Sequence, residues 1–307
     1  MYILVIGASG FVGNSLLRRL NGFENTEVKA VSRDIKKVSG DFKDSKNISF
    51  QKFDLCNDNF SKLDFSPNII INLSSTQPSS DNLAWGDFLE GNVSSVSSLV
   101  DYARSKKIEK IIHLSTSSVF SPSQSPINKD TLPSPDNYYG LSKLLGENLL
   151  RISRLRSEFD TSIVVLRFPS IYGDLHHAGL VHTYYTLAKE DQNIELFFEG
   201  KSLRNIIFID DVIDILEIFI NAKDTKAYSA YNLGSRNHLT TYEIASSIKK
   251  ELDSKSKLIP LKSKDSKNQN VIIQVENFAK RYNYEAKLIE DSLKLYIKSK
   301  NSNNYEI

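Results

Sequence analysis

Three glycines follow the first apolar segment of the chain at a spacing that few backbone arrangements use. Residues 3–6 lead directly into Gly7-Ala8-Ser9-Gly10-Phe11-Val12-Gly13, a G-x-x-G-x-x-G sequence, and residues 10–20 have helical spacing. Glycine is needed where the backbone turns sharply, approaches a pyrophosphate and packs a helix against a strand. The N-terminus of the following helix offers N–H groups and the positive end of its dipole to phosphates. The order strand, loop, helix therefore predicts a dinucleotide-binding fold.

Short β-type segments and helical segments alternate through the first half of the chain. The β-type segments are almost continuous in Val, Ile and Leu, as is typical of strands that are buried on both faces of a sheet. This alternation predicts an α/β fold with a doubly wound parallel sheet, the Rossmann arrangement. The expected strands are 3–6, 28–32, 48–53, 69–73, 111–115 and 163–168, and the expected helices are 10–20, 88–105 and 138–158.

The length of the chain exceeds what this sheet needs. With 307 residues, and roughly 150 residues per domain, the chain has room for about two domains. We expect residues 1–172, with a returning segment at about 203–234, to form the dinucleotide-binding domain. Residues 173–202 and 235–307 are expected to form a smaller C-terminal α/β lobe that binds substrate. The Ser- and Pro-rich stretch 121–137 has no period and is expected to be a loop.

Charge and cysteine content exclude several classes of protein. Lys and Arg number 39 and Asp and Glu number 37, so the formal net charge is +2, which argues against a globally basic nucleic-acid-binding protein. The single cysteine, Cys56, cannot form a disulfide within the chain, and we expect no metal site. No apolar stretch approaches the roughly 20 residues of a membrane-spanning helix, and the first residues lack the charged region of a signal peptide. We therefore expect a cytoplasmic protein that binds neither membranes nor nucleic acid.

The end of the second expected strand bears on the choice of cofactor. In dinucleotide-binding folds an acidic residue at this place binds the ribose 2′-hydroxyl of NAD, whereas an arginine accommodates the 2′-phosphate of NADP. Ser32 stands at the place of the acid and Arg33 follows it, which favours NADP over NAD. Arg33 could instead be an exposed loop residue, and Asp34 could pair with it or face solvent. After the third strand, Asp54 could accept a hydrogen bond from the adenine amino group or cap the turn.

Tyr139 and Lys143 form a Tyr-x-x-x-Lys pair at the start of the expected helix 138–158. Residues four positions apart lie on the same helical face. A phenol with a pKa of about 10 is a poor base at neutral pH, but an adjacent ammonium group favours the phenolate and lowers that pKa. Tyr139 could then exchange a proton with a hydroxyl or ketone oxygen while hydride moves on the carbon. The neighbouring Tyr138 lacks this spacing.

A serine- and threonine-rich segment follows the expected strand 111–115. The strand ends in Ser115 and continues into Thr116-Ser117-Ser118. A hydroxyl at the carboxyl end of a strand lies where open parallel sheets bind ligands. The alternative is a Ser/Thr-rich turn without a ligand.

With these features, the chain resembles the extended short-chain dehydrogenase/reductase family, in its branch of nucleotide-sugar epimerases and dehydratases. The resemblance covers nearly the whole chain and implies a Rossmann fold. It includes the glycine loop, the Tyr139/Lys143 pair, Asn92-Val93 at the start of a helix, and Arg204. It also includes Pro67-Asn68-Ile69-Ile70-Ile71-Asn72-Leu73-Ser74-Ser75, Arg167-Phe168-Pro169-Ser170-Ile171-Tyr172-Gly173, Phe208-Ile209-Asp210-Asp211-Val212 and Tyr231-Asn232-Leu233-Gly234.

The resemblance implies a role for the matched residues. Thr116 would hydrogen-bond the reacting sugar oxygen, Tyr139 would be the acid/base, and Lys143 would bind the nicotinamide ribose and tune Tyr139. Substrate contacts are expected from Thr116, Ser117, Ser170 and Arg204, whose guanidinium suits a pyrophosphate. Cofactor contacts are expected from Gly7, Ser9, Gly10, Phe11, Val12, Gly13, Ser32, Arg33, Asp54, Leu55, Leu73, Ser74, Ser75, Asn92, Tyr139, Lys143, Pro169 and Ile171.

Two reactions on a nucleotide-activated sugar fit this resemblance. An NAD(P)-dependent epimerase oxidises a sugar carbinol and returns the hydride to the other face, whereas a 4-ketoreductase uses NADPH once, which Arg33 favours. Ser117-Ser118 stand where 4,6-dehydratases carry Asp-Glu, which argues against a dehydratase. Ser170 stands where many members carry an asparagine that touches the substrate phosphates, so the sugar and its nucleotide stay open.

Two further expectations follow from the resemblance. A catalytically inactive dinucleotide-binding or RNA-binding relative is the alternative function, and the intact Thr116, Tyr139 and Lys143 argue against it. Members of the family often form homodimers through the two long helices, here 88–105 and 138–158. We therefore expect a homodimer that binds a nucleotide sugar.

Overall fold

The computed structural model describes residues 1–78, 84–157, 160–223, 227–262 and 270–302. The chain forms two compact units. The first unit comprises Met1–Phe120, Pro133–Arg167 and Ile213–Tyr231, and the second comprises Ser121–Leu132, Phe168–Val212 and Asn232–Ile307. Part of the expected loop at 121–137 thus belongs to the second unit, and the segment that returns to the first unit begins at Ile213.

The first unit is built on a sheet that has seven strands in the described part of the chain, in the order β11-β6-β5-β4-β1-β2-β3. Apart from β11, this is the doubly wound order 3-2-1-4-5-6, whose direction of winding reverses between β1 and β4. The pairs β1·β2, β2·β3, β1·β4 and β4·β5 are parallel, so the predicted α/β fold with a parallel sheet is confirmed. The strands are β1 Tyr2–Ile6, β2 Glu27–Ser32, β3 Ile48–Lys52, β4 Ile69–Asn72, β5 Lys110–Thr116, β6 Ser162–Phe168 and β11 Tyr228–Asn232.

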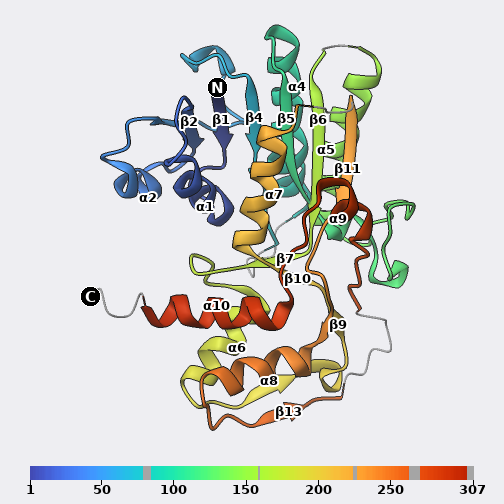
Figure 1. Ribbon diagram of the computed structural model, residues 1–307. Coiled ribbons are helices and arrows are strands. Elements are labelled where there is room, and N and C mark those ends of the chain that lie inside the picture. The colour runs from blue at the N-terminus through green and yellow to red at the C-terminus, as the bar shows by residue number, and fades with distance from the viewer. Residues whose placement is uncertain (79–83, 158–159, 224–226, 263–269, 303–307) are drawn as a thin grey trace. The chain divides into compact units, whose positions relative to one another are not determined.

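Helices cover both faces of this sheet because successive strand residues point to opposite faces (Figure 1). Leu4 and Ile6 of β1 share a buried cluster with Leu99 of α4 and Leu150 of α5, so these helices pack on one face. Arg19 of α1 forms ion pairs with Asp214 and Glu217 of α7, which joins these two helices to each other. The helices of this unit are α1 Phe11–Leu20, α2 Lys36–Ser39, α3 Trp85–Leu89, α4 Ser95–Ser105, α5 Tyr138–Leu155 and the part of α7 Ile209–Asn221 from Ile213 onward, with the 3₁₀ turns η1 Gly40–Phe42, η2 Phe60–Lys62 and η4 Ser117–Val119.

The helix expected at 88–105 differs from the prediction. It begins at Trp85 as α3, passes through a π-helical turn η3 at Glu90–Ser94, and continues as α4 from Ser95. A π turn inserts one extra residue into the helical repeat, and hydrophobic periodicity does not reveal such an insertion. The insertion has a consequence for the site, because Asn92 lies within this turn.

The returning segment completes the first unit through backbone groups. The ammonium group of Lys110, at the start of β5, is buried and donates to the carbonyl oxygens of Phe219 (2.6 Å), Ile220 (3.4 Å) and Ala222 (2.6 Å). These carbonyls belong to the last turn of α7 and to the residue after it, where a helix leaves acceptors unsatisfied. The lysine thus caps the end of the helix.

The second unit is a small α/β assembly. Strand β7 pairs in parallel with β10, β8 in parallel with β13, and β9 antiparallel with β12. Tyr296 of α10 is buried between the rings of Tyr172 and Tyr185, whose centroids lie at 5.8 and 5.5 Å. Its elements are η5 Pro122–Gln124, β7 Ser170–Tyr172, α6 Gly179–Lys189, β8 Ile194–Leu196, η6 Phe197–Gly200, β9 Leu203–Arg204, β10 Ile206–Phe208, the start of α7, β12 Leu239–Thr240, α8 Thr241–Glu251, β13 Leu258–Pro260, α9 Glu276–Tyr282 and α10 Ile289–Ser302.

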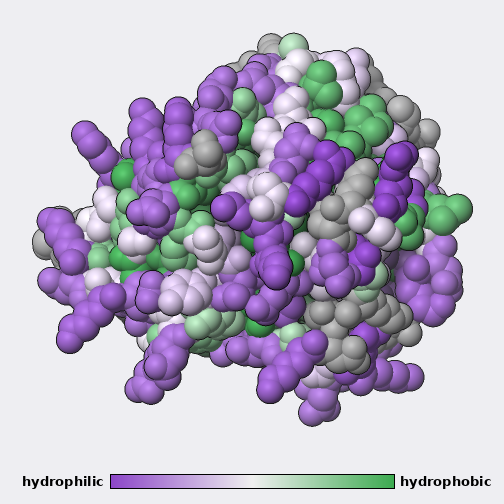
Figure 2. Space-filling view, turned by 90° about the horizontal axis from the view of Figure 1, so that it is seen from above, coloured by the Kyte–Doolittle hydropathy of each residue, from purple (hydrophilic) through white to green (hydrophobic). Residues whose placement is uncertain are grey.

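In the described part of the chain, no helix combines the length and hydrophobicity that a bilayer span requires. Within the same residues, no group of three or more His, Cys, Asp and Glu side chains is arranged to hold a metal ion. The space-filling view shows a face covered mostly by hydrophilic side chains, with hydrophobic ones in smaller patches (Figure 2).

Candidate active site

The glycine loop joins β1 to α1 in a backbone path that other residues could not follow. Gly7 has a φ of +81°, and a Cβ atom on it would lie 2.8 Å from the backbone nitrogen of Ser74 after β4. A Cβ atom on Gly13 would lie 2.4 Å from the carbonyl oxygen of Gly7. The glycines therefore allow the loop to lie against the end of β4, at the point where the winding of the sheet reverses.

The N-terminus of α1 is suited to an anion. Gly10 is the N-cap residue, no side chain caps it, and the first turn contains no acidic residue. Phe11 and Val12 begin the helix, and Ser9 is half-buried just before it. The first N–H groups of a helix have no partner within the helix, so they and the dipole can hold the phosphates of a dinucleotide.

The end of β2 carries the residues that bear on cofactor choice. The side chain of Ser32 is buried, and its hydroxyl has no hydrogen-bond partner among the described residues. Arg33 is exposed. Asp34 forms an ion pair with Lys37 (3.4 Å), so its carboxylate is directed to the turn that follows. The arrangement leaves Arg33 accessible at the edge of the sheet, with no acidic side chain at the position of Ser32.

Asp54, after β3, is engaged in its own turn. Its carboxylate accepts from the backbone nitrogen of Cys56 (3.0 Å) and from the side-chain amide of Asn57 (3.1 Å). The next residue, Leu55, is buried in the hydrophobic core of the first unit. Capping of this turn, one of the two roles expected for Asp54, is therefore present in the structure.

A chain of polar groups follows β4. The Asn72 side chain is buried, accepts from the backbone nitrogen (3.2 Å) and hydroxyl (2.6 Å) of Ser74, and lies 3.2 Å from Nδ1 of His113 on β5. Burial and the charge of Lys143 hold the pKa of His113 well below its usual value, so this ring is neutral. Leu73 continues the sheet by donating to the carbonyl of Ile6 (3.0 Å). The turn after β4, which the resemblance assigns to cofactor binding, is therefore held in place by the buried side chain of Asn72.

Asn92 connects this turn to the helix that carries Tyr139. Its side-chain oxygen accepts from the hydroxyl of Ser75 (3.1 Å) and the backbone nitrogen of Thr76 (2.8 Å). Its amide donates to the Thr76 carbonyl (3.0 Å) and to the Ser142 hydroxyl (2.9 Å), which in turn donates to the Tyr139 carbonyl (2.8 Å). Both polar atoms of the Asn92 amide are hydrogen-bonded, so Asn92 links the turn after β4 to helix α5.

The structure brings Tyr139, Thr116 and Lys143 together. The side chains of Thr116, Ser75 and Gln77 lie close enough to the phenol of Tyr139 to influence its pKa. Lys143 lies one helical turn later, is buried, and donates to the carbonyl of Leu114 at the end of β5 (2.7 Å). The three residues predicted from the sequence as the proton-transfer group therefore lie at one edge of the sheet.

The neighbouring Tyr138 points elsewhere. It is 58% exposed and contacts the ring of Trp85 (5.6 Å between centroids), whereas Tyr139 packs against Phe88 (6.3 Å). Adjacent residues of a helix differ by about 100° around its axis. Tyr139, and not Tyr138, therefore shares the helical face of Lys143, as the spacing predicts.

Burial is the largest influence on the pKa values of Tyr139 and Lys143. It raises the pKa of Tyr139, against the opposing hydrogen bonds of Gln77, Ser75 and Thr116. Burial also lowers the pKa of Lys143 to about 8, although the negative charge of Glu147 opposes this shift. The sequence predicts that the ammonium lowers the pKa of Tyr139. In the structure the Lys143 ammonium binds the Leu114 carbonyl and burial raises the pKa of the phenol, which stays protonated at neutral pH.

The segment after Thr116 is held tightly against α5. Thr116 accepts from the backbone nitrogen of Ser118 (3.1 Å) in the turn η4, and so orients Ser117 and Ser118. A Cβ atom on Gly140 would lie 1.9 Å from the Ser118 carbonyl oxygen. The close approach of this glycine fixes the distance between Tyr139 and Thr116.

The remaining predicted residues belong to the second unit. Ser170 is exposed and Ile171 half-buried on β7, which pairs with Ile206 and Ile207 of β10. Pro169 precedes this strand. Arg204 on β9 is half-buried, and burial lowers its pKa while the nearby Tyr184 opposes the shift. Pro169, Ser170, Ile171 and Arg204 are therefore all placed within the second unit.

Two features were not predicted from the sequence: Gln77, which lies near the phenol of Tyr139, and a buried ion pair one helical turn after Lys143. Glu147 and Arg167 form an ion pair at 2.6 Å. Glu147 lies four residues after Lys143, so extending the helical face by one more turn would have found it. Gln77 carries no such signal, because it follows β4 in an irregular segment.

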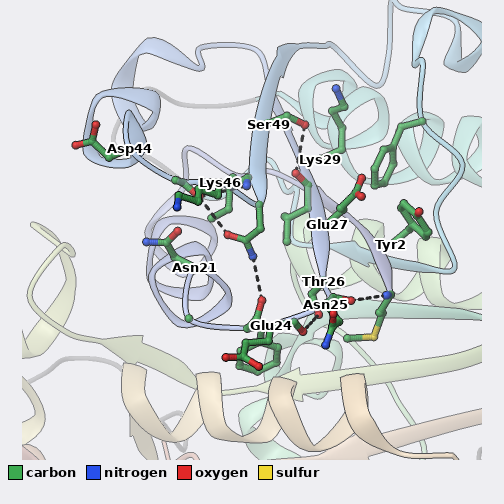
Figure 3. Close-up of a pocket in the computed structure, with 18 of the residues that line it drawn as sticks. Tyr2, Asn21, Glu24, Asn25, Thr26, Glu27, Lys29, Asp44, Lys46 and Ser49 are labelled. Carbon is green, nitrogen blue, oxygen red and sulfur yellow. Dashed lines mark hydrogen bonds between the residues drawn. The ribbon is translucent and has the colours of Figure 1, made fainter.

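A groove of about 1090 Å³ lies at the opposite edge of the sheet, at the amino-terminal ends of β1, β2 and β3 (Figure 3). It is lined by residues such as Asn25, Glu27 and Asn47, and the backbone there is held by bonds such as that from the Met1 amino group to the Asn25 carbonyl (2.7 Å). None of the predicted site residues lines it. Ligands of open parallel sheets bind at the carboxyl ends of the strands, so this groove is not the site.

Comparison with known proteins agrees with this geometry. The model of the NAD dependent epimerase/dehydratase family matches residues 3–234. A UDP-glucose 4-epimerase of Mycolicibacterium smegmatis is 26% identical over 262 residues, which cover 81% of this chain and 82% of the relative. An uncharacterized UDP-glucose epimerase of Bacillus subtilis is 26% identical over 226 residues, 69% of this chain and 70% of the relative.

Solved structures share the fold. A UDP-glucuronic acid 4-epimerase from Bacillus cereus, in complex with UDP-glucuronic acid and NAD, superposes with a TM-score of 0.86 over 98% of this chain and 99% of the other, at 23% identity. The extent of the family match, over more than half of the chain, decides the assignment. The chain belongs to the NAD dependent epimerase/dehydratase family and is an enzyme of the extended short-chain dehydrogenase/reductase type.

Proposed function

We propose that the chain is an NAD(P)-dependent epimerase that inverts a carbinol of a nucleotide-activated sugar, with a UDP-sugar as the first candidate. The observation that carries the proposal is the phenol of Tyr139 beside the hydroxyl of Thr116, with the buried ammonium of Lys143 one helical turn away. A phenol in this arrangement suits proton exchange with a sugar hydroxyl. The 4-epimerases of UDP-sugars among the relatives and structural neighbours support the substrate class.

The residues around the glycine loop fit a dinucleotide. A Cβ atom on Gly7 would clash with the backbone after β4, and one on Gly13 would clash with the loop itself. The start of α1 has no side-chain cap, so it offers N–H groups to a diphosphate. A nicotinamide dinucleotide held there would supply the hydride chemistry at the sugar carbon. Further contacts to the cofactor would come from Ser74 and Ser75 in the turn after β4, a turn that the fully bonded amide of Asn92 holds in place.

The chain's own residues would handle the proton. In its phenolate form, the minor form in the cofactor-free protein, Tyr139 would take the proton of the sugar hydroxyl as the carbon is oxidised and return it to the oxygen afterwards. Thr116 donates to the same oxygen and orients it, and Lys143 stabilises the phenolate by its charge. A positioned acid/base of this kind contributes about 10²- to 10⁴-fold to the rate. Ser117 would contact the substrate next to Thr116. Arg204 would bind a diphosphate, since a guanidinium binds this group through paired hydrogen bonds.

A second candidate, a 4-ketoreductase that consumes NADPH, is favoured by one observation. Arg33 is exposed at the end of β2, and the residue before it, Ser32, brings no carboxylate that would repel a 2′-phosphate. We therefore propose that NADP is bound more tightly than NAD, although neighbouring structures contain NAD. An inactive cofactor-binding or RNA-binding relative is disfavoured because Thr116, Tyr139 and Lys143 are all present.

The proposal includes a cytoplasmic homodimer formed through α4 and α5. Helix α5 exposes Leu141, Leu145, Ile152 and Leu155, which are between 36% and 67% exposed. Leu141, Leu145 and Ile152 follow the spacing of one helical face. Exposed apolar side chains in such a row suit burial against a second copy.

The decisive experiment is a screen of UDP- and dTDP-hexoses, UDP-uronates and their 4-keto forms with NAD(H) and NADP(H). Inversion at C4 with no net change in absorbance at 340 nm is expected for an epimerase. Stoichiometric consumption of NADPH with a 4-keto sugar would identify the ketoreductase instead. A 4-keto-6-deoxy product from a hexose would contradict both, and cofactor binding without any turnover would favour the inactive relative.

A further inference from the structure

A buried carboxylate lies one helical turn behind Lys143. Glu147 of α5 is 1% exposed. Arg167 of β6 donates to it through Nε, at 3.1 Å to each carboxylate oxygen, and through a terminal nitrogen at 2.6 Å. The hydroxyl of Ser115 on β5 donates to the same carboxylate at 2.5 Å. The carboxylate is therefore held from two strands besides its own helix.

Charged and titratable groups of α5, β5, β6 and β11 lie near this carboxylate, among them Arg151 of α5, whose charge acts on Tyr228 together with that of Arg167. Lys143 comes from α5, Arg167 from β6 and His113, which is neutral, from β5. Tyr228 of β11 lies near Glu147, and burial together with this negative charge raises the pKa of its phenol to about 12. Two cations thus share one buried anion, which leaves the cluster with an excess of positive charge.

An ion pair with Arg167 alone would not explain this arrangement. Replacing a buried ion pair by apolar residues is often neutral or stabilising, so a buried pair is weak evidence of a stabilising role. Lys143 gives the carboxylate a further role, because the Lys143 ammonium is buried and its hydrogen-bond acceptor, the carbonyl of Leu114, carries no charge. A buried ammonium needs a nearby anion to stay protonated. Glu147 lies at the helical spacing that provides one.

The same carboxylate also reaches the strand that carries Thr116. Ser115 and Thr116 are neighbours on β5. Ser115 is bonded to Glu147, whereas the side chain of Thr116 lies beside the phenol of Tyr139. A displacement of Glu147 would therefore be passed through Ser115 to the hydroxyl that faces Tyr139.

We propose that Glu147 is a positioning residue of the active site, whose carboxylate, held by Arg167 and Ser115, keeps the Lys143 ammonium charged beside the end of β5. The proposal rests on the proposed roles of Tyr139 and Lys143. Glu147 itself touches neither substrate nor cofactor in this scheme. Its effect reaches the phenol of Tyr139 through the charge of Lys143 and the place of Thr116.

The titration of Lys143 in the cofactor-free protein tests the proposal directly. The protein is labelled with [13Cε]lysine, and the Lys143 resonance is identified by its absence in Lys143→Met. A midpoint at about pH 8 is expected for the wild-type protein. Glu147→Gln should lower this midpoint by about one pH unit or more, the effect of losing an opposite charge at short range. Glu147→Asp should restore most of the difference.

A surface variant serves as the control. Asp101→Asn on α4 also removes one negative charge from the first unit, but this carboxylate is exposed and pairs with Arg104 (2.7 Å). It should leave the Lys143 midpoint where it is in the wild-type protein. A folded Glu147→Gln protein whose midpoint also stays there would overturn the proposal.

The orphaned guanidinium of Arg167 could prevent Glu147→Gln from folding. The double variant Glu147→Gln/Arg167→Gln removes this unpaired charge, and its Lys143 midpoint should still fall, by roughly half a unit, because the nearer charge has the larger effect. A double variant with a midpoint at or above that of the wild-type protein would contradict the proposal.

Activity provides an independent measurement. In Glu147→Gln the alkaline limb of kcat should move to lower pH by the same amount as the Lys143 midpoint, and Glu147→Asp should move it back. A structural role alone would lower kcat at every pH without moving the limb. If no nucleotide sugar is turned over, the proposed function fails, yet the titration of Lys143 still decides the role of Glu147.

Discussion

Replacing Gly140 by alanine should damage the active site more than the fold. The added Cβ atom would lie 1.9 Å from the carbonyl oxygen of Ser118 and 2.7 Å from its carbon. Cβ atoms do not come closer than about 3.0 Å to such atoms, so α5 and the turn η4 must separate by roughly 1 Å. That movement separates Tyr139 from Thr116, whose side chains lie next to each other beside this contact. A misplacement of about 1 Å can cost on the order of 10²-fold in rate.

The assay compares kcat on the substrate found in the nucleotide-sugar screen with the midpoint of thermal unfolding. Gly140→Ala should lower kcat by about 10²-fold and destabilise the protein by about 1–3 kcal/mol, as overpacking does. Gly40→Ala is the matched control, because nothing lies within 4 Å of its added Cβ and its φ of −61° suits alanine. Wild-type kcat in a folded Gly140→Ala protein would show that the separation of Tyr139 and Thr116 does not control the reaction.

Tyr139→Phe should keep the fold and cofactor binding but lose at least about 10²-fold in kcat, whereas Tyr138→Phe should change kcat little; similar losses in both would contradict the assignment. Arg33→Ala should remove most of the preference for NADP over NAD, about 1–3 kcal/mol by titration calorimetry, and equal affinities in the wild-type protein would refute this reasoning. Arg204→Ala should raise KM for the nucleotide sugar without changing cofactor affinity, and an effect on stability alone would make it a structural residue. The pKa of Lys143 falls to about 8 on folding, so the unfolded chain binds more protons between about pH 8 and 10.5 and stability rises with pH in that window. Lys143→Met should therefore abolish turnover yet stabilise the protein at pH 7 by up to about 3 kcal/mol, a gain that disappears above about pH 10; no gain at pH 7 by urea unfolding would contradict the pKa.

The sheet was predictable because its strands are buried on both faces. Segments such as 69–73 and 163–168 are continuous in Ile, Val and Leu, and the observed strands β4 and β6 agree with them to within one residue at each end. The glycine loop and the Tyr139/Lys143 pair were predictable for a different reason. Their chemistry depends on residues that are close in the sequence, so the spacing itself carries the information.

Other features depend on contacts between distant segments. The π turn at Glu90–Ser94 has the same apolar residues as an ordinary helix, and only the bonds of Asn92 to Thr76 and Ser142 reveal what the extra residue achieves. The direction of the Tyr139 pKa shift depends on how deeply the ring is buried and on which acceptor the Lys143 ammonium chooses. The burial of the Tyr139 ring and the acceptor of the Lys143 ammonium cannot be predicted from local sequence, because both arise only when β5 and α5 pack together.

The cap that Lys110 places on the end of α7 has a consequence for how the chain is made. Phe219, Ile220 and Ala222 leave the ribosome more than a hundred residues after Lys110, and strand β11 follows them. A nascent chain that ends before them would leave β6 as an open edge and the Lys110 ammonium without these acceptors. The cofactor-binding unit therefore cannot finish folding during synthesis until the segment Ile213–Tyr231 has emerged, with part of the second unit already made. Expression of residues 1–167 alone should give an aggregation-prone fragment, and the same fragment with residues 213–231 joined to it by a short linker should be soluble.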